Sequence, residues 1–250
     1  MKKYLNSKYL PAVIAIFGGI GLVLRLELYA SAMDGKDLLI PGHPLELLLL
    51  GLTAAVLVLI VIAVWPLYGS LRYSDNFPAS ATAAAGSVAA AVGIVLTVLL
   101  AQEQPGRLYQ LWKLLGLLCG PCLVLAGYCR LQGKRPFFLL HGAVSVFWLL
   151  HLICHYQGWS VNPQLQDYLY PLLASVALLM FSYYQTAFDV GSGKRRTLLA
   201  VGLAGAFFGI VSLSGSDTPL LYGSFALWAL TNLCSLIPVR RRPKPVAEGE

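Results

Sequence analysis

The sequence predicts an all-α integral membrane protein, a bundle of eight transmembrane helices with both termini in the cytoplasm. Three observations carry this prediction: the composition, the spacing of the apolar segments and the position of the charges. Hydrophobic residues make up 58% of the 250 residues, charged residues only 12%, and the mean hydropathy is +0.71. A soluble domain of this length rarely carries so apolar a chain, so the soluble classes are excluded.

Long apolar segments alternate with short polar ones along the whole chain. A helix needs about 20 apolar residues to cross a hydrocarbon core of about 30 Å, and each of these segments comes close to or exceeds that length. The eight predicted helices occupy residues 10–33, 44–69, 79–101, 108–129, 136–157, 164–188, 196–213 and 218–238.

The basic residues predict the orientation of these helices. Cytoplasmic loops of membrane proteins are enriched in lysine and arginine. With the N-terminus inside, the outer loops hold only Lys36 and Arg107. The inner segments then hold fourteen basic residues: Lys2, Lys3, Lys8, Arg72, Arg130, Lys134, Arg135, Lys194, Arg195, Arg196, Arg240, Arg241, Arg242 and Lys244. Removing one helix would scatter this bias, so we expect eight.

The net charge of +7 would suit nucleic-acid binding in a soluble protein. Here the charges follow the loop pattern of a membrane protein, so no nucleic-acid partner is predicted and the bilayer is the expected surrounding. Short loops and a basic leader favour a bacterial cytoplasmic membrane. The first helix is expected to remain uncleaved, because Arg25 and Glu27 interrupt the apolar segment in front of the Ala30-Ser31-Ala32 sequence that imitates a cleavage site.

Residues 1–239 are predicted to form one transmembrane domain, and residues 240–250 a basic and polar cytoplasmic tail that is expected to be disordered. Residues 1–130 and 131–239 share a rough plan, which would make them parallel halves of four helices each. Any eight-helix chain looks similar when divided in this way, and that alternative stays open. Residues 79–93 are rich in alanine, glycine and serine, which predicts close packing of this helix against its neighbours.

Four ionisable residues are predicted to form a polar layer roughly 5–10 Å below the outer surface of the membrane. They are Arg25 and Glu27 in the first helix, Lys113 in the fourth and His151 in the fifth, and Glu46 and His155 extend the layer. Buried charges in a membrane are costly unless they pair or reach water, so the layer is expected to face the interior.

Arg25 and Glu27 are about 200° apart around their helix and cannot point in the same direction. The predicted arrangement turns Glu27 inward, toward Lys113 or His151, while Arg25 meets Glu46 or extends to the lipid headgroups. The alternative is that all charges near the helix ends extend to the headgroups and have no further role.

Two other sites are open alternatives. His151 and His155 have the i, i+4 spacing of a metal site on one helix face, with Glu27 or Glu46 as further ligands. Cys119-Gly120-Pro121-Cys122 is the tetrapeptide of thioredoxin-type redox proteins, although here it falls in the middle of a predicted helix with no strand before it.

The spacing of His141 and His155 resembles that of the haem ligands along one helix of ferric reductase-type membrane proteins. That family uses further histidines on a second helix. The histidine left for that role here is His43, in an outer loop, so no haem or other cofactor is predicted.

The first functional hypothesis is a transporter or permease for a small solute or ion, with Glu27, Lys113, His151 and His155 at its site. The second is a membrane partner, sensor or scaffold that docks another protein or anionic lipid through its basic inner loops. An enzyme is the least favoured class, because no hydrolase, paired-aspartate or dinucleotide motif occurs and no catalytic residue can be assigned.

Overall fold

The computed structural model describes residues 9–32, 43–67, 72–102, 106–159 and 168–237, and this part of the chain contains eight helices and no strand. Each helix falls within or close to one predicted segment, which confirms the all-α class. The helices are α1 (Leu10–Ser31), α2 (Pro44–Val64), α3 (Ala81–Leu100), α4 (Arg107–Leu131), α5 (Phe138–Trp159), α6 (Leu169–Val190), α7 (Arg195–Val211) and α8 (Pro219–Cys234).

Six of these helices, α1 to α6, are long and apolar enough to cross a membrane. The remaining two are shorter, with 17 residues in α7 and 16 in α8. At 1.5 Å per residue they measure about 25 Å, slightly less than a hydrocarbon core of about 30 Å. The bundle therefore has the features expected of a helical membrane protein, while the count of eight spans stays a prediction.

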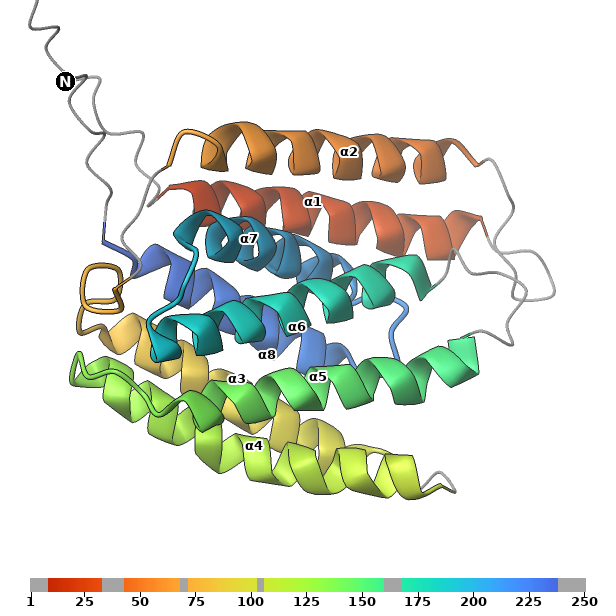
Figure 1. Ribbon diagram of the computed structural model, residues 1–250. Helices are drawn as coiled ribbons and strands as arrows, with labels where there is room; N and C mark the ends of the chain where they lie inside the picture. The colour runs from red at the N-terminus through yellow and green to blue at the C-terminus, as the bar shows by residue number, and fades with distance from the viewer. Residues whose placement is uncertain (1–8, 33–42, 68–71, 103–105, 160–167, 238–250) are drawn as a thin grey trace, which may run out of the picture.

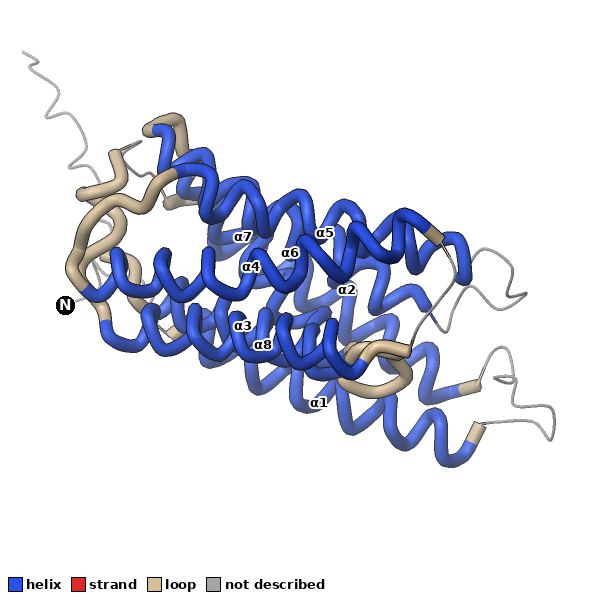
Figure 2. The backbone as a smooth tube through the Cα atoms, turned by 90° about the horizontal axis from the view of Figure 1, so that it is seen from below, coloured by secondary structure: helices blue, strands red, loops and turns tan. Residues whose placement is uncertain are grey.

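The helices α3 to α8 form a closed ring (Figures 1 and 2). Each helix packs against the next in the chain, and α8 packs back against α3. The α1–α2 hairpin lies outside this ring, where both of its helices contact α7. Because α1, α2, α6 and α8 surround α7, that helix presents little surface to the surroundings. The proposed division into halves of four helices stays a prediction.

Successive helices run in opposite directions, so α1 begins and α8 ends at the same end of the bundle, on the left in Figure 1. We call this end the basic end, and the other the opposite end. The basic end carries the segments that join α2 to α3, α4 to α5 and α6 to α7. Most of the described basic residues lie there: Arg72, Arg130, Lys134, Arg135, Lys194, Arg195 and Arg196. At the opposite end, α4 begins at Arg107, and Lys113 lies in its second turn.

The small residues of α3 pack closely against both neighbours, as predicted. A Cβ atom added at Gly93 would lie 2.3 Å from Cβ of Ser224 in α8, and one at Gly86 would lie 1.8 Å from Oγ1 of Thr231. On the other side, a Cβ added at Gly127 of α4 would lie 3.1 Å from Cβ of Ser87. The backbones of α3, α4 and α8 approach one another because these positions lack side chains.

The outer surface of the bundle is strongly apolar. In α2, for example, Leu47, Leu48, Val58 and Ile62 each expose more than half of their side-chain surface. Soluble monomers rarely present such a continuous apolar surface. These side chains are suited to contact with lipid.

Candidate functional site

The predicted polar layer separates into two groups at the opposite end of the bundle. Arg25, Glu27 and Glu46 belong to the α1–α2 hairpin, which packs on α7. Lys113, His151 and His155 belong to α4 and α5, on the other side of the ring (Figure 1). The structure therefore brings the two histidines together but leaves the glutamates away from them.

The predicted orientation of α1 is reversed. Arg25 is buried, with 2% of its surface exposed, whereas Glu27 is exposed. The Arg25 guanidinium donates hydrogen bonds to the carbonyl oxygen of Val211 (3.3 Å) and to the Tyr29 hydroxyl (3.1 Å), and it lies 5.1 Å from the centre of the Tyr170 ring. The same face of α1 carries Gly18 and Gly21, which allow close contact with α7 and so turn Arg25 inward.

Arg25→Met is therefore expected to lower the free energy of unfolding by about 2 kcal/mol, because the hydrogen bonds of a buried guanidinium are lost. Glu27→Gln is expected to leave stability unchanged, since the Glu27 side chain is exposed. Both are measured by titrating the purified protein from mild detergent into SDS. A larger loss for Glu27→Gln than for Arg25→Met would contradict the observed orientation of α1.

Lys113 connects the ends of two helices rather than reaching His151. Its Nζ donates a hydrogen bond to the carbonyl oxygen of Ala101 (3.0 Å), at the end of α3, and lies 5.4 Å from the centre of the Tyr109 ring. A lysine can satisfy a helix-terminal carbonyl in this way. It therefore fixes α4 against α3 at the opposite end.

His151 and His155 belong to a polar network inside the ring. Their ring centres are 3.9 Å apart, and Nδ1 of His155 donates to the carbonyl oxygen of His151 (2.9 Å). Nε2 of His151 lies 3.1 Å from the Tyr222 hydroxyl, which lies 2.9 Å from Oγ of Ser175. Ser175 in turn donates to the carbonyl oxygen of Pro171 (2.8 Å). The network thus leads from His155 into the bundle.

A pocket of about 570 Å³ opens beside this network, between the ends of α3, α4, α5 and α8. The volume is typical of a site for a small molecule. Its lining is mixed, with aromatic rings, hydroxyls, an imidazole and a carboxylate; it includes Thr97, Tyr109, Trp112, His155, Asp217 and Thr218. His155 was predicted from the sequence, whereas Asp217 was not, because it lies in the short segment between α7 and α8 and belongs to no motif.

In the described residues, neither the alternative metal site nor the alternative redox site gains further functional groups. Among the described residues, no third histidine, cysteine, aspartate or glutamate gathers with His151 and His155 into a candidate metal site. Cys119 and Cys122 are free thiols in the middle of α4, where Cys119 is fully buried. Small side chains at this position allow α4 to approach α3, since a Cβ added at Gly120 would lie 2.6 Å from Val95.

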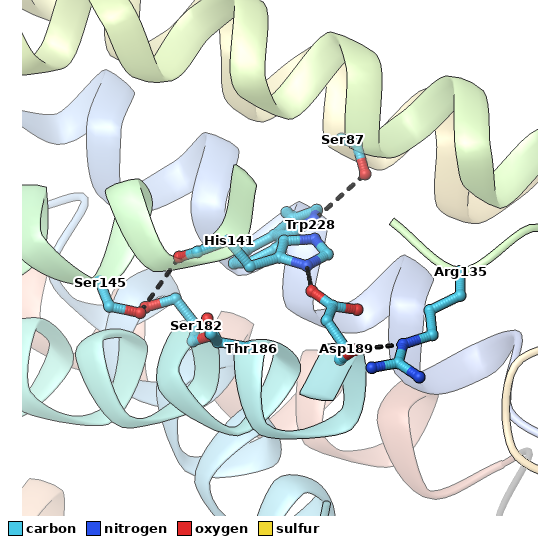
Figure 3. Close-up of polar contacts among 8 residues, drawn as sticks. All are labelled: Ser87, Arg135, His141, Ser145, Ser182, Thr186, Asp189 and Trp228. Atoms are coloured by element: carbon cyan, nitrogen blue, oxygen red, sulfur yellow. Dashed lines mark hydrogen bonds and ion pairs between the residues drawn. The ribbon is translucent and has the colours of Figure 1, made fainter. Parts of the chain in front are cut away.

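A second buried polar cluster, at the basic end, was not predicted (Figure 3). Nδ1 of His141 lies 2.5 Å from Oδ2 of Asp189, and both residues are buried. Asp189 is the one buried carboxylate in the part of the chain that the structure describes. Nε of Arg135 donates to the backbone carbonyl oxygen of Asp189. The contact joins the first turn of α5 to the last turn of α6.

Arg130 lies at the same end of the bundle. Its guanidinium donates to Oγ of Ser235 (2.7 Å) and to the carbonyl oxygen of Pro78 (3.3 Å), and it lies 4.6 Å from the centre of the Phe77 ring. Burial raises the pKa of the neighbouring Tyr73 to about 12, although Arg130 acts in the opposite direction. Tyr73 is therefore neutral at physiological pH.

Two further arginines at the basic end bind backbone and side-chain groups of the protein itself. The Arg195 guanidinium donates to Oδ1 of Asn76 (2.8 Å) and to the carbonyl oxygen of Ile237, and Nε of Arg196 donates to the carbonyl oxygen of Leu67 (2.5 Å). From sequence, these residues were interpreted only as loop charges. The structure shows that Arg130 and Arg195 are buried and hold the connecting segments onto the ring.

No known protein family, curated protein or solved structure matches this chain. The site is therefore interpreted from its own geometry and chemistry.

Proposed function

We propose that this protein is a membrane transporter for a small solute, and that the pocket at the opposite end is its solute site. The pocket carries the proposal, because it combines a volume of about 570 Å³ with several polar groups in its lining. Binding pockets of this kind combine a mainly apolar wall with a few polar groups that orient the ligand. His155 and Asp217 contribute an imidazole and a carboxylate to the lining, and Thr97 and Thr218 contribute hydroxyls.

In the proposed topology all eight helices cross the membrane and the basic end faces the cytoplasm, in a bacterial cytoplasmic membrane. Support comes from the gathering of most described basic residues at one end, which is the pattern of cytoplasmic loops. The pocket then opens to the outside. At the basic end the rings of Phe77 and Phe188 meet edge to face, 5.1 Å apart, beside the buried Arg130. This conformation would correspond to an outward-open state.

The alternative, a partner or scaffold that docks protein or anionic lipid through its basic loops, has less support. Arg130 and Arg195 are buried and bind groups of this chain, so they are not available to a partner. Arg72, Lys134 and Lys194 are exposed and keep this option open at the basic end. Arg240, Arg241 and Arg242 lie outside the described residues.

The proposal is tested by labelling single cysteines from outside intact cells with a membrane-impermeant maleimide. The background replaces all five native cysteines, and the test positions are Thr97→Cys and His155→Cys. The control is Val146→Cys, an exposed position on the apolar surface of α5. Labelling of both test positions, but not of the control, is expected for a water-filled pocket. Protection of both test positions in a folded protein would reject transport and favour the partner function.

A further inference from the structure

We propose that His141 and Asp189 together bind one exchangeable proton, that this proton is the coupling ion of the transporter, and that its loss opens the basic end. The proton binding follows from the cluster itself, whereas its coupling to a solute rests on the proposed function.

The burial of the pair supports a role beyond packing. Asp189 is 1% exposed and His141 3% exposed. Ionisable groups inside membrane bundles are expensive and commonly mark ion or proton pathways. The contact of 2.5 Å between Nδ1 and Oδ2 is a charge-assisted type of hydrogen bond, in which one proton joins the imidazole to the carboxylate.

Both residues stand at the unfavourable ends of their helices. His141 lies in the first turn of α5, where the helix dipole opposes a positive charge, and Asp189 lies in the last turn of α6, where it opposes a negative one. The dipoles therefore reduce the advantage of a fixed ion pair over a neutral pair, which favours exchange of the proton.

Two buried polar atoms beside the His141–Asp189 contact have no hydrogen-bond partner among the described residues. These atoms are Oδ1 of Asp189 and Nε2 of Gln185. The two residues are one turn apart on the same face of α6. Buried polar groups are normally satisfied, so these two atoms are free to bond a proton carrier such as a water molecule beside the pair.

The effect of one proton on the His141–Asp189 pair depends on the charged groups around the pair. Arg130 of α4 and Tyr73 of the segment before α3 act electrostatically on one another and on Asp189, and Tyr73 is neutral. Arg135 binds the Asp189 backbone, and from α7 Arg195 is directed to Asn76 instead.

The α8 side of the pair is uncharged. The Trp228 ring lies 6.0 Å from the His141 ring, and Trp228 donates to Ser87. When His141 is neutral, the positive charge of Arg130 still acts electrostatically on Asp189. A shared proton then strengthens the link between α5 and α6, and its loss weakens that link at the basic end.

Two measurements on the protein in nanodiscs test this inference. The first is ¹⁵N NMR of labelled histidine, with His141 assigned by the loss of its signal in His141→Gln. The His141 ring is expected to show both protonation states across the pH range in which the protein stays folded. The pH dependence of the His141 signal should differ in Asp189→Asn but not in Asp75→Asn. Asp75 is a matched control because it is an exposed acid at the same end. A single protonation state of His141 throughout would overturn the proton site, without any need for a variant of Asp189.

The second measurement is the distance between spin labels at Phe138→Cys and Val190→Cys, which are exposed positions at the basic ends of α5 and α6. The distance is expected to lengthen by about 5 Å from low to high pH. It should be long at every pH in Asp189→Asn. A control pair at Ile153 and Val176, toward the opposite ends of the same helices, should change less. If the NMR signal of His141 changes with pH but the spin-label distance does not, the proposed opening of the basic end is wrong.

The two proposals fail in different ways. If the pocket is labelled but His141 keeps one protonation state, the proton site is wrong and the transporter proposal remains. If His141 titrates but Thr97→Cys is protected from outside, the proton site remains and its coupling to solute transport is wrong.

Discussion

Replacing Asp189 with alanine is expected to lower the free energy of unfolding by about 3 kcal/mol. The change removes the partner of His141 at 2.5 Å and also a buried carboxylate that acts electrostatically on Arg130. Breaking a buried pair from one side is strongly destabilising, because the remaining charge is left without compensation. Unfolding in SDS, followed by circular dichroism, measures the loss.

The matched control is Asp75→Ala, which removes an exposed acid at the same end and is expected to change stability by less than about 0.5 kcal/mol. A double-mutant cycle with His141→Ala should give a coupling of about 1 kcal/mol or more between the two side chains. Equal losses for Asp189→Ala and Asp75→Ala, or additive effects in the cycle, would show that the pair contributes nothing.

Replacing Gly93 with alanine is expected to lower the free energy of unfolding by about 2 kcal/mol. The new Cβ would lie 2.3 Å from Cβ of Ser224 and 3.3 Å from the backbone oxygen of Leu220. Rotation of a side chain cannot relieve a clash with a Cβ atom, so α3 and α8 must separate. The same SDS titration measures the effect.

Gly51→Ala is the control for this prediction, because no atom lies within 4 Å of the Cβ that it adds. It should be neutral or slightly stabilising, since alanine favours the helix more than glycine does. Ser224→Gly removes the atoms that clash, so it should restore most of the stability of Gly93→Ala. A failure of this rescue would mean that the contact between α3 and α8 is not the cause of the loss.

The helices could be predicted from sequence because each is a long apolar segment with polar residues at its ends. The first segment, predicted at 10–33, is observed as Leu10–Ser31. The larger differences also have local causes. The second segment was predicted to extend to residue 69, but α2 ends at Val64, because Pro66 has no backbone N–H to continue the helical hydrogen bonds.

The rotation of each helix about its axis could not be predicted in the same way. Arg25 and Glu27 lie on different faces of α1, and charge alone does not show which face is buried. The glycines at positions 18 and 21 of α1 carried the missing signal, because they mark the face that packs against α7.

The proton site was missed for a related reason. Arg130, Arg135 and Arg195 were read as loop charges, and His141 was considered only for its spacing from other histidines. His141 and Asp189 are 48 residues apart in the sequence, and they meet because α5 and α6 are neighbours in the ring. Such a contact between two isolated polar residues leaves no pattern in a single sequence.

The most direct test of the transport mechanism is the outside labelling rate of Thr97→Cys in the cysteine-free background, compared with and without Asp189→Asn. Alternating access couples the two ends of a transporter, so that opening the basic end should close the pocket at the opposite end. We predict a decrease in the labelling rate of about fivefold or more in Asp189→Asn and no decrease in Asp75→Asn. An unchanged rate in Asp189→Asn would contradict the coupling between the two ends.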